Sequence, residues 1–119
     1  MSDETRFEGK VEKTWGHELI FATNELYCGK LLHFSKAENR CSMHFHKEKD
    51  ETWFVLRGSF IIRILDTSNA KISETTIREG QNLRIPPLVI HQIEALEDES
   101  TIIEVSSPDS VEDNYRVWR

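Results

Sequence analysis

Apolar and polar residues alternate with a period of two along most of the chain after residue 30. In one segment Ile62 and Ile64 flank Arg63, and a later one alternates Leu83 and Ile85 with polar residues. This spacing places every second side chain on one face of an extended strand. No long window shows the 3.6-residue period of a helix. Eight short strands are predicted, at residues 30–34, 40–46, 52–58, 59–65, 71–77, 82–86, 91–96 and 101–107.

Turn-forming residues separate these segments. Glycine follows Arg57 and Glu79, and two prolines stand at 86 and 87, where the missing N–H ends ladder pairing. Short strands at near-regular spacing are typical of a β-sandwich or β-barrel. The pattern therefore predicts an all-β fold.

Length and charge narrow the picture. The chain has 119 residues, so we expect one domain, with an N-terminal segment (1–27) packing on a barrel (28–106) and a C-terminal tail (107–119). A formal net charge of -6 argues against binding to nucleic acid or to an anionic membrane. The polar N-terminus and the absence of a long apolar run suggest a cytoplasmic protein. Two cysteines, 13 residues apart, suit free thiols.

A group of imidazoles and one carboxylate is the most informative local feature. His44 and His46 are two residues apart, so a strand would project both from the same face. Glu51 follows across a short charged loop, and His91 begins a later strand after the two prolines. Such a set is suited to a divalent metal ion with open coordination positions. Zinc is our first choice, with iron, manganese or nickel as alternatives.

The spacing of this group resembles a known family. The chain carries two motifs, His44-x-His46-x4-Glu51-x6-Gly58 and Gly80-x5-Pro86-x4-His91. In this order they resemble the two signature motifs of the cupin superfamily, whose members are jelly-roll β-barrels. The resemblance implies that the three histidines and Glu51 are metal ligands. The sequence departs from the motifs at Glu38 and Leu88, where glycine is usual, and at Ala95, where asparagine is frequent.

Several flanking segments resemble a narrower group. The stretches "VEKTWG" (11–16), "GKLLHF" (29–34), "IIEV" (102–105) and "EDNYR" (112–116) are similar to the cupin module of type II mannose-6-phosphate isomerases, which also ends mannose-1-phosphate guanylyltransferases. This resemblance implies interconversion of mannose 6-phosphate and fructose 6-phosphate. The chain differs at Thr14, where proline is typical, and at His44, where glutamine is typical.

Other charged residues are candidates for substrate chemistry. Lys30 and Glu104 lie within apolar strands and are the proposed catalytic residues, with His33 as a further candidate base. The possible clamps for a phosphate or carboxylate are Arg40, Arg84 and Arg116. The loop residues Lys47, Glu48, Lys49 and Asp50 are interpreted as solvated charges.

Two functional hypotheses follow. The first is a metal-dependent isomerase of a phosphorylated sugar, in which the metal polarises a carbonyl and a base moves a carbon-bound proton through an enediol(ate). The second is a non-catalytic cupin that binds a sugar or another small molecule through its metal. An iron-dependent dioxygenase ranks below both. The resemblance also leads us to expect a homodimer.

Overall fold

The computed structural model describes residues 9–118, which form two antiparallel β-sheets. The six-stranded sheet has the order β1 (Lys10–Lys13), β2 (Gly16–Thr23), β3 (Cys28–Phe34), β10 (Ser100–Ser106), β5 (Glu51–Arg57), β8 (Asn82–Ile85). The five-stranded sheet has the order β11 (Tyr115–Trp118), β4 (Met43–Phe45), β9 (Ile90–Ala95), β6 (Ser59–Asp66), β7 (Lys71–Arg78). A short 3-10 helix, η1 (Val111–Asp113), precedes β11.

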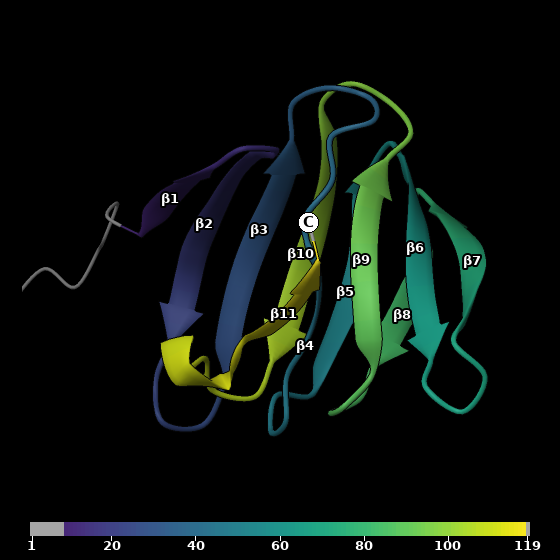
Figure 1. Ribbon diagram of the computed structural model, residues 1–119. Coiled ribbons are helices and arrows are strands. Elements are labelled where there is room, and N and C mark those ends of the chain that lie inside the picture. The colour runs from purple at the N-terminus through teal and green to yellow at the C-terminus, as the bar shows by residue number, and fades with distance from the viewer. Residues whose placement is uncertain (1–8, 119) are drawn as a thin grey trace, which may run out of the picture.

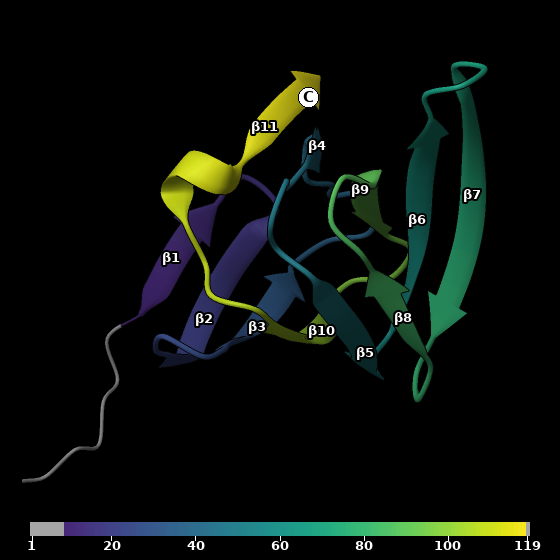
Figure 2. The same ribbon diagram turned by 90° about the horizontal axis from the view of Figure 1, so that it is seen from below.

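The predicted all-β jelly roll is confirmed. Each of the eight predicted segments corresponds to a strand, from β3 to β10. The two sheets face each other, and the chain crosses from β10 of one sheet to β11 of the other at its C-terminal end (Figure 1, Figure 2). Within residues 9–118 no helix has the length and apolar character needed to cross a membrane.

Three strands were not predicted from the sequence. β1 and β2 form a hairpin that extends the six-stranded sheet beyond β3, and β11 pairs with β4 at the edge of the other sheet. All four residues of β1 and all four of β11 are exposed, so neither strand carries the buried-exposed alternation that identifies a strand.

Buried apolar side chains form a core between the two sheets. Its largest fully buried side chains include Trp53, Phe34 and Phe60. Trp15 stacks on Phe34 with ring centroids 4.3 Å apart and closes one end of this core. Because strand residues alternate between faces, the buried residues of β3, β10 and β5 all project toward the opposite sheet.

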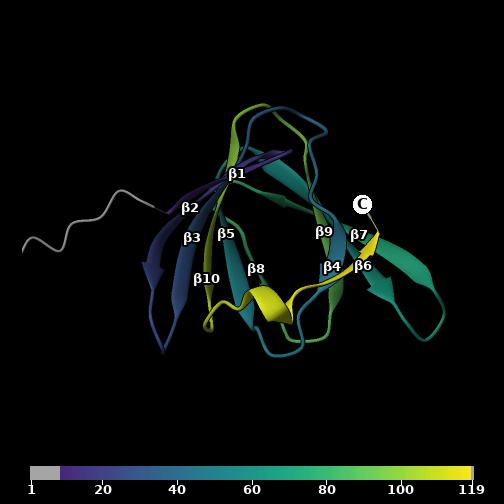
Figure 3. The same ribbon diagram turned by 60° about the vertical axis from the view of Figure 1, so that its left-hand side comes forward.

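The inner face of the six-stranded sheet becomes polar toward one end. Register pairs Glu104 of β10 with Lys30 of β3 on one side and with Trp53 of β5 on the other. Glu51 begins β5 and lies in the next row, opposite Ser106. These polar side chains share the face of the core residues. That face is directed toward the five-stranded sheet, which lies opposite the six-stranded one (Figure 3).

A row of apolar side chains crosses the outer face of the same sheet. Leu19, Leu31, Ile103 and Phe54 follow one another across β2, β3, β10 and β5. Phe54 is 40% exposed and Val105, farther along β10, is 56% exposed. The expected homodimer stays a prediction.

Two of the departures from the cupin motifs have a structural consequence. Glu38 and Leu88 have φ angles of 74° and 72°, in the left-handed region that glycine adopts without strain. Their N–H groups bond the carbonyls of Ala95 and His46, so both turns are tied to neighbouring strands. A side chain in this region costs about 1–2 kcal/mol.

We therefore expect Glu38→Gly to stabilise the protein by about 0.5–1 kcal/mol, the relief of strain less the greater flexibility of glycine in the unfolded chain. Urea unfolding measures this change. Lys36→Gly, at an exposed position of the same turn without a positive φ, is the matched control and should lower stability. Equal losses in both variants would contradict the strain at Glu38.

Candidate metal centre

Both sheets contribute to one cluster of side chains that could hold a metal ion. His44 of β4 and His91 of β9 are direct cross-strand partners, and His46 follows the end of β4. One ring nitrogen of each histidine lies within 4.8 Å of the other two. Glu51 reaches in from the opposite sheet, with its Oε2 3.6 Å from His46 Nε2 and 3.9 Å from His91 Nε2. The structure thus brings together the three histidines that the motifs indicated and places Glu51 beside two of them.

The orientation of each imidazole is fixed through its Nδ1 atom. His44 Nδ1 lies 2.8 Å from the carbonyl oxygen of Ser42, and His91 Nδ1 lies 2.8 Å from that of Val89. His46 Nδ1 bonds the carbonyl of Asp113. A carbonyl oxygen only accepts, so each Nδ1 carries the proton and donates it. In its neutral form each ring therefore leaves its Nε2 lone pair free, as a metal ligand requires.

Burial disfavours the charged forms of His44, His91 and Glu51. It lowers the pKa of His44 to about 4 and that of His91 to about 3. Burial, together with the neighbouring Glu104 charge, raises the pKa of Glu51 to about 8. Trp53 Nε1 donates to Glu51 Oε1 at 2.8 Å, which orients the carboxyl group.

Two atoms of the cluster lack a hydrogen-bond partner. They are Glu51 Oε2 and His91 Nε2, both buried and without a partner among the residues that the structure describes. Buried polar atoms are nearly always satisfied, so an orphaned acceptor needs an explanation. A divalent cation between three Nε2 lone pairs and a carboxylate oxygen would satisfy both atoms. The residues present therefore fit a metal ion.

A buried ion-pair network lies beside Glu51. Lys49 Nζ is 2.8 Å from Glu104 Oε2 and 3.0 Å from Asp109 Oδ1. Lys30 Nζ is 2.8 Å from Asp109 Oδ2 and 3.4 Å from Glu18 Oε1. The side chains of Lys49 and Glu104 are each only 5% exposed. Our interpretation of Lys49 as a solvated loop charge was therefore wrong.

Mutual pairing keeps this network ionised. Burial alone would raise the pKa of Glu104, but the Lys49 and Lys30 charges outweigh it and hold that pKa below its ordinary value. The same carboxylates raise the pKa of Lys49 against the opposing effect of burial. Asp109, beside both ammonium groups, has its pKa lowered to about 2 despite partial burial. At neutral pH Glu104 is thus a carboxylate and both lysines are cations.

The arginines proposed for an anion clamp lie in different places. Arg84 faces the outside of its sheet, opposite Ile85, and bonds Asp50 with two nitrogens at 3.0 and 2.6 Å. Arg40 pairs with Glu94 at 3.9 Å on the outside of the other sheet. Because strand residues alternate, both guanidinium groups point away from the cluster. We do not retain Arg40 and Arg84 in the substrate site.

Arg116 and His33 also lie on different faces of their sheets, one toward the cluster and the other away from it. Arg116 of β11 is the register partner of His44, so its side chain leaves the sheet on the face of the cluster. His33 lies on the outer face of its sheet, with its ring nitrogens bonded to Thr101 and Glu99. His33 is therefore withdrawn as a candidate base.

Three residues of the site were missed by the sequence interpretation. Lys49, Asp109 and Asp113 come from the loop after β4 and from the segment after β10. None lies in a strand, so no alternation could have indicated burial. For Asp109 and Asp113, the only signal was an acidic residue in a tail of otherwise uninformative pattern.

Comparisons with known proteins agree with the fold. The family described as Cupin matches residues 34–115. No curated protein matches the chain by sequence. Among solved structures, KdgF from Halomonas sp. is 20% identical, with a TM-score of 0.69 and 81% of each chain covered.

Two larger proteins share the fold. Oxalate decarboxylase from Bacillus subtilis is 18% identical with a TM-score of 0.78, over 91% of this chain and 29% of that one. The capsular polysaccharide assembling protein CapF from Staphylococcus aureus is 19% identical with a TM-score of 0.79, over 92% and 34%. This chain therefore spans about a third of either protein, and at these identities the likeness establishes the fold alone.

Proposed function

The chain belongs to the cupin family, and from this premise we propose that it is a metal-dependent isomerase of a small sugar. The observation that carries the proposal is the orphaned pair of atoms, Glu51 Oε2 and His91 Nε2, beside an ionised Glu104. A bound cation would satisfy the two orphaned atoms, and the Glu104 carboxylate is a proton acceptor next to them. Together they favour chemistry over binding alone.

A bound divalent ion would polarise the carbonyl and the adjacent hydroxyl of an open-chain sugar. We assign the remaining roles to two residues of the chain. Glu104, held by Lys49 at 2.8 Å and by the Ser106 hydroxyl at 3.1 Å, is the proposed proton acceptor. Lys30 makes two ion pairs and stays protonated, so we assign it an electrostatic role rather than that of a base.

Recognition of a phosphorylated sugar is the finer part of the proposal. It is supported by the resemblance of the flanking segments to mannose-6-phosphate isomerases. In the structure the lysines are already paired with carboxylates, and Arg40 and Arg84 face outward. Arg116, on the face of the cluster, is the remaining arginine that we propose for the phosphate.

We expect the metal-loaded protein to convert mannose 6-phosphate to fructose 6-phosphate. Glu104→Gln should lower kcat by about 10²–10⁴-fold, because the amide cannot accept the proton, while its metal content stays that of the wild type. Glu99→Gln, an exposed acid outside the site, is the control. Mannose without phosphate, assayed in parallel, tests whether the phosphate, for which we propose Arg116, is recognised. Stoichiometric metal with no conversion of either sugar would favour a non-catalytic binding protein.

A further inference from the structure

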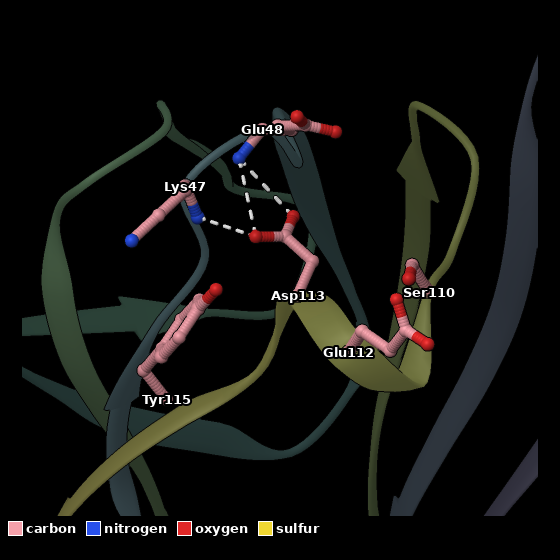
Figure 4. Close-up of a pocket in the computed structure, with 6 residues that line it drawn as sticks. All are labelled: Lys47, Glu48, Ser110, Glu112, Asp113 and Tyr115. Atoms are coloured by element: carbon pink, nitrogen blue, oxygen red, sulfur yellow. Dashed lines mark hydrogen bonds between the residues drawn. The ribbon is translucent and has the colours of Figure 1, made fainter.

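The segment after β10 closes over the loop that joins β4 to β5. Figure 4 shows the Asp113 carboxylate pointing into this loop. Its Oδ1 accepts the backbone N–H of Lys47 at 2.7 Å, and its Oδ2 accepts those of Glu48 and Lys49, both at 3.1 Å. Three successive N–H groups converging on one carboxylate form an anion-binding nest, here filled from within the chain.

Asp113 also contacts a member of the cluster directly. Its backbone carbonyl accepts the Nδ1 proton of His46, so one residue holds both the loop and the imidazole that begins it. β11 starts two residues later and pairs Tyr115 with Phe45, whose rings stack at 5.1 Å. The segment from Asp113 to β11 therefore contacts both His46 and the strand before it, β4.

His46 needs this support more than the other two histidines do. His44 and His91 lie within strands and pair with each other across the ladder. His46 lies beyond Phe45, the last residue of β4, and has no ladder partner within residues 9–118. Its carbonyl accepts the N–H of Leu88 at 2.7 Å, which places the backbone, but the orientation of its ring depends on Asp113.

We propose that Asp113 is a positioning residue of the metal centre, holding His46 through its carbonyl and the following loop through its carboxylate. The proposal rests on the metal binding proposed above. It assigns the C-terminal segment, which the sequence indicated only as a tail, to the construction of the site. Asp113 acts through His46 and does not contact the metal itself.

Metal affinity tests the proposal. Asp113→Ala keeps the backbone carbonyl but removes the carboxylate that ties this segment to the loop, so the carbonyl is no longer held against His46 Nδ1. Competition between the purified protein and a chelator for Zn²⁺ should therefore show a Kd about 10–100-fold weaker in this variant, the range found when the support of a ligating histidine is lost. Asp113→Asn keeps an acceptor oxygen and should fall between Asp113→Ala and the wild type. Glu112→Ala, in the same 3-10 helix but with its side chain exposed, should bind as the wild type does.

A second readout separates this proposal from metal binding as such. Nitrogen NMR of the metal-free protein should find His46 protonated at Nδ1 in the wild type and in Glu112→Ala. In Asp113→Ala the His46 signal should average toward both tautomers, while those of His44 and His91 stay fixed.

Each outcome decides the matter. Unchanged Zn²⁺ affinity in Asp113→Ala overturns the proposal. If the wild type binds no metal, the proposed function fails. The tautomer measurement on the metal-free protein then still tests Asp113, and an unchanged His46 tautomer in Asp113→Ala would overturn its role. If Asp113→Ala does not fold, the same two measurements on Asp113→Asn decide, with wild-type affinity and a fixed His46 tautomer counting against it.

Discussion

Replacing His91 with alanine is expected to abolish stoichiometric metal binding while the chain stays folded. His91 is 1% exposed and its Nε2 has no hydrogen-bond partner among the described residues. The truncation removes one of three proposed imidazole ligands, so we expect affinity to fall by more than about 100-fold. It also removes an unsatisfied buried atom, which offsets part of the cost of the cavity.

Metal content after gel filtration measures the first effect. Thermal unfolding measures the second, because an ion that binds only the native state raises Tm. Added Zn²⁺ should raise the Tm of the wild type and leave that of His91→Ala unchanged. His33→Ala is the matched control, since His33 bonds Glu99 and Thr101 on the outer face. Full metal occupancy in His91→Ala would remove His91 from the ligand set.

The largest loss of stability is expected from Lys49→Met. This change leaves Glu104, 4% exposed, without the ammonium group 2.8 Å from its carboxylate. Breaking a buried ion pair on one side typically costs about 3–5 kcal/mol, because the remaining charge stays out of water. Asp109 loses one of its two cations as well, which adds to the effect.

Urea unfolding of the metal-free proteins measures this cost. Lys47→Met, two residues earlier in the same loop and exposed, should change stability by less than about 0.5 kcal/mol. The double variant Lys49→Met/Glu104→Gln should recover much of the loss, since the unpaired charge is then gone. A loss near that of Lys47→Met would mean that Glu104 remains hydrated in the folded protein.

Much of the barrel could be predicted because strand periodicity is a local property. Alternation within 59–65 and 82–86 was enough to predict β6 and β8 and to distinguish their inner from their outer residues. By the same rule Arg84 and its neighbour Ile85 point to different faces of the sheet. The outward position of Arg84 was therefore implied by the sequence once Ile85 was taken as a core residue. Our proposal of Arg84 as a clamp overlooked that consequence.

The cluster itself was only partly accessible from the sequence. Two histidines spaced by two share a face in any strand, which is why His44 and His46 could be paired. That Glu51 and His91 meet them depends on two sheets folding face to face. The motif resemblance indicated this meeting, whereas the alternation of residues by itself did not.

By itself, then, the sequence determined the strands from β3 to β10, their inward faces and the residue types able to bind a metal, because these follow from stereochemistry over a few neighbouring residues. Only the tertiary structure decided that Lys49 is buried and that Asp113 bonds both His46 and the loop after it. The Asp113 carboxylate and the N–H of Lys47 are 66 residues apart in the chain. Their contact results from the crossing between the sheets, and no local pattern encodes which loop that crossing will cover.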